Sequence, residues 1–276
     1  MKKLSFLVAV AIFLFASCNN PASTEKKENG TKDSATTATV DTTKNVTAAQ
    51  WAEYEAASKK DAGWITLFDG KTFNGWRGYL RADMPKAWTI EDGAIKINGS
   101  GNGEAGAKDG GDIIFGKKFK NFELTFDWKV DKGSNSGVLY LAQEVPGDPI
   151  WKSAPEYQIL DNANHPDAKL GKDGNRQSAS LYDLIPAKPQ NAKPYGQWNT
   201  GSIMVYKGTV VHKQNGVNVL EYHLWTDDWK KMVDGSKFKG WEKFIDAGGP
   251  NHEGYIGLQD HGDNVWYKNI KIKILE

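Results

Sequence analysis

The sequence predicts an all-β protein, a sandwich of two antiparallel sheets preceded by a short N-terminal helix. Three observations favour this class. Segment 122–130, FELTFDWKV, alternates apolar and polar side chains without a break, which is the period of a strand with one buried face. Asn215-Gly216, between two strand-like segments, is typical of a two-residue hairpin. The chain also has 11 Trp, 10 Tyr, 11 Phe and 29 Gly, as expected for short strands joined by tight turns.

The first 18 residues have the pattern of a bacterial lipoprotein signal peptide. A basic start, MKK, precedes an apolar stretch, LSFLVAVAIFLFA, that is short for a membrane span. It ends in LFASC, which resembles a lipobox, and Cys18 is the only cysteine of the chain. We therefore predict that Cys18 is lipidated, that no disulfide exists, and that the protein is lipid-anchored in the cell envelope, touching the membrane through the anchor alone. The alternative is an ordinary cleaved signal peptide.

A polar tether and a single folded domain are expected after the signal peptide. Residues 19–46 are almost free of apolar side chains, which predicts a disordered tether. Residues 47–62 predict a short helix with Thr47 as N-cap and Gly63 as its terminator. From 63 to 276 we expect strands and loops, and strands are predicted at 122–130, 136–142, 201–225 (as a meander), 254–259 and 265–275. Two longer excursions, 144–196 and 226–250, have little strand character, and such loops often carry function.

Charge and standard motifs exclude several classes of function. The 35 basic and 34 acidic residues leave a net charge of +1, so no general basic field indicates nucleic acid as a partner. The glycine-rich segment 99–112 lacks the Gly-Lys-Ser/Thr ending of a phosphate loop, and we interpret it as a flexible surface loop. Nucleophile elbow, HExxH and dinucleotide fingerprint are all absent from the sequence. The abundant Trp residues either stack on sugar rings or fill the core.

Polar side chains recur where predicted strands begin or end. Glu156 and Gln158 alternate with apolar neighbours, so one strand face carries a carboxylate and a carboxamide, although a solvent-facing strand would look the same. His261 follows an apolar strand and stands between polar residues and a glycine, a suitable place for acid–base chemistry. The full set suits the hydroxyls of a sugar and comprises Asn135, Glu156, Gln158, Asn199, Gln259, Asp260 and His261.

One loop contains residues of the kinds that bind metals. Asp161, His165 and Asp167 could coordinate a divalent cation, but their spacing fits no standard site. We therefore interpret 161–167 as a polar loop and commit to no cofactor, with a divalent cation left as the alternative.

Seven motifs in fixed order resemble the 3-keto-disaccharide hydrolase domain family. They include LFDGKTFNGW, PEYQILDN, SASLYDL, GQWNT and GLQDHGDNVWYKNIKI, and the match runs from about 63 to 275. The resemblance implies a concanavalin A-like jelly-roll sandwich. It also implies a carbohydrate ligand, a glycoside already oxidised to a ketone at C3, and hence an upstream sugar 3-dehydrogenase as a pathway partner.

The implied reaction assigns roles to the polar residues. A base removes the acidified C2 proton, an acid protonates the departing glycosidic oxygen, and water then adds to the unsaturated sugar. We expect His261 to be the base and Glu156 the acid. Expected substrate-binding residues are Asn135, Gln158, Asp161, Trp198, Asn199, Gln259 and Asp260. The chain lacks an Arg that many members place after the Asn-Ser-Gly motif, so a non-catalytic carbohydrate-binding lipoprotein of a polysaccharide-utilisation system is the alternative.

Overall fold

The computed structural model describes residues 45–101, 103 and 106–276. The predicted signal peptide, the lipidated Cys18 and the tether as far as residue 44 lie outside the described residues. The last two residues of the predicted tether already belong to the folded domain: Asn45 accepts a hydrogen bond from Arg77 Nε at 2.9 Å, and Val46 N donates to Gly116 O at 2.9 Å. In the described part of the chain, none of the helices has the length and apolarity needed to cross a bilayer.

The predicted N-terminal helix is present as α1 (Ala48–Ser58). Thr47 is its N-cap, and a capping box with Gln50 satisfies backbone donors at both positions. The helix ends at Ser58, before the predicted boundary at residue 62, and the chain then turns into the first strand at Ala62 and Gly63, which both take positive φ (51° and 84°). Trp51 packs against Phe119, with ring centroids 5.7 Å apart, and attaches the helix to the domain.

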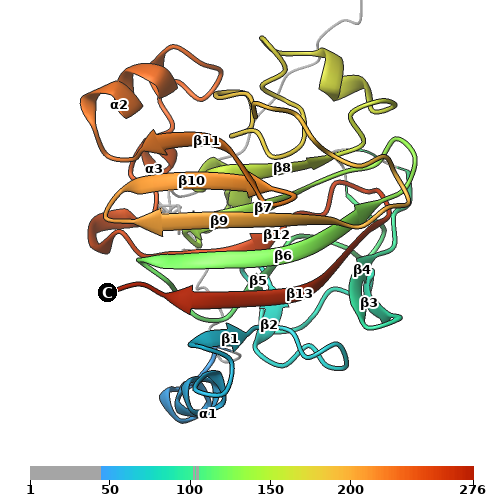
Figure 1. Ribbon diagram of the computed structural model, residues 1–276, viewed down its shortest axis with the longest axis vertical. Coiled ribbons are helices and arrows are strands. Elements are labelled where there is room, and N and C mark those ends of the chain that lie inside the picture. The colour runs from blue at the N-terminus through green and yellow to red at the C-terminus, as the bar shows by residue number, and fades with distance from the viewer. Residues whose placement is uncertain (1–44, 102, 104–105) are drawn as a thin grey trace, which may run out of the picture. The chain divides into compact units, whose positions relative to one another are not determined.

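The described strands form two antiparallel sheets, as predicted (Figure 1). The large sheet has the order β11-β10-β9-β6-β13-β4-β3, with β1 paired to β13, and the small sheet has the order β2-β5-β12-β7-β8. The large-sheet strands are β1 (Trp64–Thr66), β3 (Trp88–Glu91), β4 (Ala94–Ile97), β6 (Phe122–Val130), β9 (Asn199–Tyr206), β10 (Thr209–Gln214), β11 (Val217–His223) and β13 (Val265–Ile274). The small-sheet strands are β2 (Trp76–Gly78), β5 (Ile113–Phe115), β7 (Asn135–Ala142), β8 (Glu156–Leu160) and β12 (Tyr255–Leu258).

The sequence patterns that predicted these strands are seen in their burial. Every second residue of β6 is buried from Phe122 to Val130, and the residues between them are only partly buried. Asn215 and Gly216 both have positive φ (49° and 81°) and join β10 to β11, as the hairpin prediction requires. The confirmed prediction is therefore a sandwich of antiparallel sheets with a short helix ahead of it.

The small sheet has two different faces, and this positions the functional site. Tyr157 and Ile159 of β8 point into the main core between the sheets. On the opposite face a second apolar cluster contains Leu139 and Ile114 together with Ile150 from the excursion after β7. That excursion includes the 3-10 helix η2 (Ile150–Lys152), and the later excursion contains α2 (Asp227–Asp234), α3 (Glu242–Ile245) and the 3-10 helix η4 (Gly249–Asn251). Because α3 packs against η2, the two excursions meet over this outer face.

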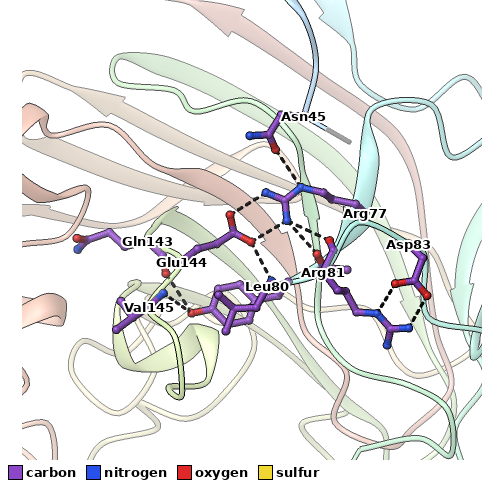
Figure 2. A network of polar contacts seen from close by, with 10 residues as sticks. Asn45, Arg77, Leu80, Arg81, Asp83, Gln143, Glu144 and Val145 are labelled. Atoms are coloured by element: carbon purple, nitrogen blue, oxygen red, sulfur yellow. Dashed lines mark hydrogen bonds and ion pairs between the residues drawn. The ribbon is translucent and has the colours of Figure 1, made fainter. Parts of the chain in front are cut away.

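A buried ion pair holds the start of the first excursion in place. Arg77 of β2 donates from both terminal nitrogens to the two carboxylate oxygens of Glu144, each at 2.7 Å (Figure 2). The two side chains are 0% and 5% exposed. Glu144 also accepts from Leu80 N at 2.8 Å, and Val145 N donates to the Tyr79 hydroxyl at 3.1 Å. The chain that leaves β7 is thereby tied to β2 and to the loop that follows β2.

Candidate active site

A cavity of about 630 Å³ lies on the outer face of the small sheet, beneath the two excursions. Its polar lining on the side of the small sheet comes from β7, β8, the end of the glycine-rich loop and the turn after β12, and includes Asp112, Asn135, Glu156, Gln158, Gln259 and His261. Five of these six residues belong to the set of strand-end polar groups found in the sequence. The structure therefore brings together residues that are up to 149 positions apart in the chain.

The alternation in β8 decides which of its side chains face the cavity. Tyr157 and Ile159 are in the core, so Glu156 and Gln158 project from the other face. The alternative of a solvent-facing strand does not apply, because Glu156 is 7% exposed and Gln158 1% exposed. Opposite them in β7 stands Gly137, where a Cβ would fall 2.1 Å from Glu156 Oε1. The absence of a side chain at Gly137 makes room for the glutamate.

Burial controls the protonation of Glu156. It raises the pKa of this carboxyl to about 8, while His261, when it is protonated, and the Lys237 ammonium act in the opposite direction. At neutral pH the side chain is therefore mainly in its acid form and can donate a proton.

The triplet Gln259-Asp260-His261 has two functions. Asp260 N–H donates to Asp112 Oδ1 at 2.9 Å, but the Asp260 carboxylate points into the glycine-rich loop and accepts from three backbone amides. These donors are Ala107 N (3.0 Å), Gly111 N (2.7 Å) and Gly262 N (2.9 Å). Asp260 thus acts as an anchor for the loop, while Gln259 and His261 on either side of it line the cavity.

The glycine-rich loop contributes directly to the site, which corrects its interpretation as a flexible surface loop. Its last part, 106–112, forms one wall of the cavity and is held by the Asp260 carboxylate. A Cβ at Gly110 would lie 2.0 Å from Asp260 Oδ2, so this approach of backbone to carboxylate needs glycine.

Asp112 is a site residue that sequence reasoning missed. Burial, with the Asp260 charge beside it, raises the pKa of this carboxyl to about 7, and the His261 charge opposes the increase. The signal in the sequence was weak: a carboxylate stands between a glycine-rich loop and a wholly buried strand, Ile113–Phe115.

His261 lies among further groups with acid–base or metal-binding chemistry. Its Nδ1 is 3.8 Å from Asp263 Oδ2, and its ring centroid is 5.9 Å from that of His165 at an interplanar angle of 78°. His165, His261 and Asp263 each offer an atom within 4.8 Å of the others, a separation that a metal ion could bridge. His165 Nδ1, however, accepts a hydrogen bond from Asp167 N at 3.1 Å, which places the ring's proton on Nε2 when it is neutral.

The loop residues considered for a metal in the sequence serve other partners. The Asp161 carboxylate accepts from Gly133 N at 2.8 Å and from Asn164 Nδ2 at 2.7 Å. Asp167 forms an ion pair with Arg176 at 2.7 Å. Both carboxylates are thus engaged with other groups of the protein.

Three predicted substrate-binding residues do not line the cavity. Asp161 is one of them. Trp198 lies on the outer face of the large sheet, where the amines of Lys129 and Lys268 are 5.2 Å and 4.0 Å from its ring centre. Asn199 is 1% exposed and accepts from Lys193 N at 2.7 Å and from Asn215 Nδ2 at 2.9 Å. Polar residues at strand ends also close turns, and the sequence does not reveal to which sheet a strand end belongs.

The excursions supply cavity residues that the sequence did not indicate. Lys237 lines the cavity, with its Nζ 3.8 Å from Asp183 Oδ2 and 4.2 Å from the ring centre of Tyr182. Burial lowers the pKa of this amine, and the Asp183 carboxylate opposes the decrease. Trp151, Phe238, Trp241 and Phe244 also line the cavity.

Two antiparallel sheets, with acid–base groups and aromatic rings converging in one cavity, define the class of the protein: it is a β-sandwich enzyme that acts on glycosides. The chain belongs to the 3-keto-alpha-glucoside-1,2-lyase-like domain family, whose model matches residues 63–273.

Known proteins resemble the chain over most of its length. A 3-keto-disaccharide hydrolase of Bacteroides thetaiotaomicron is 55% identical over 295 aligned positions, which cover 100% of both chains. A crystal structure of a putative glycosyl hydrolase from Parabacteroides distasonis superposes with a TM-score of 0.67 at 30% identity, covering 79% of this chain and 97% of that one. A second putative glycosyl hydrolase from the same organism has a TM-score of 0.58 at 28% identity, covering 77% and 99%.

Proposed function

We propose that the protein cleaves the glycosidic bond of 3-keto-disaccharides. The observation that carries the proposal is the convergence of His261 with two carboxyls of raised pKa, Glu156 and Asp112, in one cavity. The similarity to a relative named for this hydrolysis supports the choice of substrate.

The C3 ketone makes an elimination route possible. It acidifies the C2 proton and leaves the glycosidic oxygen on the carbon β to the carbonyl. Removal of the C2 proton gives an enolate, which expels the glycosidic oxygen as the C1–C2 double bond forms, and the leaving group departs as an alcohol. Addition of water across that double bond returns a proton to C2 and a hydroxyl to C1, so the net reaction is hydrolysis.

The residues of the cavity supply the proton transfers. His261 is the proposed base, and Asp263, 3.8 Å from its Nδ1, stabilises the imidazolium that forms. Glu156, protonated at neutral pH because its pKa is about 8, delivers a proton to the departing oxygen. Asp112, whose pKa of about 7 leaves it partly ionised, can accept the proton of the water in the second step.

Other groups hold the sugar and its developing charge. Lys237 is suited to bind the C3 oxygen as it becomes an enolate, because it is a cation at the cavity surface near Glu156. Asn135 Oδ1 and Gln259 Oε1 are buried and have no hydrogen-bond partner in the described part of the chain. Substrate hydroxyls would satisfy both oxygens, since buried polar atoms otherwise destabilise a fold.

We propose that the activity takes place in the cell envelope. A lipid anchor at Cys18 would hold the enzyme in the cell envelope, and an enzyme that oxidises sugars at C3 must act before it. The motivation for the anchor is the position of the only cysteine after an apolar leader.

The test is turnover of a 3-keto-disaccharide by the purified protein, with the unoxidised disaccharide as the control substrate. In D₂O the product should carry deuterium at C2. His261→Ala should lower turnover by about 10²- to 10⁴-fold, the usual effect of removing a general base, while substrate binding changes much less.

Two results would contradict the proposal. Near-normal turnover by folded His261→Ala would remove the base assignment. Binding of the sugar without any turnover by the wild-type protein would instead indicate a carbohydrate-binding protein.

A further inference from the structure

The cavity has a second wall, made of aromatic rings, which the proposed proton transfers do not use. Trp151 of η2 and Trp241, directly before α3, have ring centroids 5.3 Å apart and planes at 40°. Trp241 also contacts Phe238 at 5.0 Å and Phe244 at 6.3 Å. These four residues all line the cavity, and we call them the aromatic wall.

Buried side chains fix the position of the aromatic wall. Phe238 and Phe244 are 4% and 3% exposed and stack on each other at 4.7 Å. The segment is fixed from below by Trp229, whose indole N–H donates to Ile245 O at 2.9 Å. Because the inner half of the wall is buried and held in this way, its outer half presents a preformed surface.

The outer half of the wall is open. Trp151 remains 38% exposed although it lies at a cavity and not on a convex surface. Within the described residues, the indole N–H groups of Trp151 and Trp241 donate no hydrogen bond, whereas those of the buried Trp76 and Trp229 each donate one to a backbone carbonyl. Exposed rings with unused donors, gathered at a cavity, are typical of a binding surface.

The position of the wall relative to the acid–base groups indicates what it binds. The keto sugar must lie against the strand ends, because its C2 proton has to reach His261. Its glycosidic oxygen has to lie close to Glu156. The remaining part of the cavity, where the aromatic wall lies, is left for the group beyond that oxygen. A cavity of about 630 Å³ is within the usual range for a ligand larger than one sugar ring.

We propose that the aromatic wall is the subsite for the leaving group and that it holds a ring by its apolar face. This inference rests on the proposed function and extends it to a substrate class. The wall offers two indole N–H donors and no carboxylate or amide side chain, so it recognises the flat or C–H face of a ring instead of a pattern of hydroxyls. A pyranose and an aryl group both present such a face, and a methyl group does not.

The test compares three 3-keto-glucosides whose leaving groups are methyl, phenyl and glucosyl. Trp151→Ala should raise KM for the phenyl and glucosyl substrates by about 10-fold, as expected for the loss of one stacked ring, and by less than about 2-fold for the methyl substrate. Trp151→Phe should restore most of the loss. Each substrate is compared with itself in two proteins, so differences in leaving-group acidity cancel. Trp198→Ala, on the large sheet, is the matched control and should change none of the three values.

The outcomes separate this inference from the function on which it rests. A change in KM for phenyl and glucosyl substrates supports a common ring subsite, and a change for one of them identifies which ring the wall accepts. An equal change for all three, or for none, with the methyl glucoside still cleaved, overturns the inference and leaves the proposed function intact. No turnover of any of the three by the wild-type protein removes the proposed function, and the subsite with it.

Discussion

Replacing Glu156 by Gln should stabilise the protein, and increasingly so as the pH rises. The pKa of this carboxyl is about 8 in the folded protein, whereas the ordinary pKa of a glutamate side chain is 4.5. The folded state therefore binds more protons than the unfolded state between these values. The contribution of the carboxyl to stability is fully present below about pH 4.5 and is lost as the pH rises through about 8.

The magnitude follows from the two pKa values. Each pKa unit corresponds to about 1.4 kcal/mol, so ionisation removes about 3 kcal/mol of folding free energy by pH 7 and about 5 kcal/mol by pH 9. Glutamine has the same size and does not ionise, so the Glu156→Gln variant keeps this folding free energy as the pH rises. His212 responds in the other direction, because burial lowers its pKa to about 4, but it is common to both proteins and cancels in their difference.

Urea unfolding of the wild-type protein and of Glu156→Gln, at pH values from about 5 to 9, measures the effect. The difference in unfolding free energy should grow with pH. Glu221→Gln is the control, because it makes the same chemical change at a side chain that is 60% exposed on β11. If the difference between wild type and Glu156→Gln is the same at both ends of the range, the carboxyl is not desolvated and its role as the acid loses its physical basis.

Three further predictions concern other parts of the molecule. Gly137→Ala places a Cβ 2.1 Å from the Glu156 carboxylate. The displaced carboxylate should lower kcat per folded molecule by about 10- to 100-fold, and unchanged kinetics would mean that its position does not matter for the reaction. Glu144→Ala removes the carboxylate that pairs with the buried Arg77 guanidinium and should reduce the free energy of unfolding by about 3–5 kcal/mol. Asp83→Ala, which breaks an exposed pair, should have a much smaller effect, and urea unfolding of both variants measures the difference. Cys18→Ser should release the protein from membranes or leave it unprocessed, and membrane retention without incorporation of labelled fatty acid would contradict lipidation.

Local periodicity predicted the parts of the structure that depend on one segment. Alternation along 122–130 and 156–160 gave the strands and the face on which Glu156 lies. Thr47 and the Asn215-Gly216 pair identified a helix start and a hairpin from their own backbone chemistry. These signals suffice because each lies within a few residues of the structure that it specifies.

The missed residues depend on contacts between distant segments. The Asp260 carboxylate meets Gly111 N across 149 residues, and no local pattern distinguishes a loop held in this way from a mobile one. Trp151 and Trp241 meet only because two excursions, each without a strong period, fold over the same face of the small sheet. For Trp198 the motif in the sequence predicted a ligand contact, but the strand order places this residue on the large sheet, away from the cavity.

The anchoring of the glycine-rich loop by Asp260 restricts how this enzyme can diversify. Any side chain larger than hydrogen at Gly110 meets the anchoring carboxylate, and one at Gly262 meets the backbone of Gly103 at 2.7 Å. The wall beside the acid–base groups therefore cannot be deepened or narrowed by single substitutions at these glycines. Changes in substrate size are more readily made in the excursions at 144–196 and 226–250, which supply another wall of the cavity. Relatives with different leaving-group preferences should consequently differ in length and composition there, while the glycine spacing around the loop stays the same.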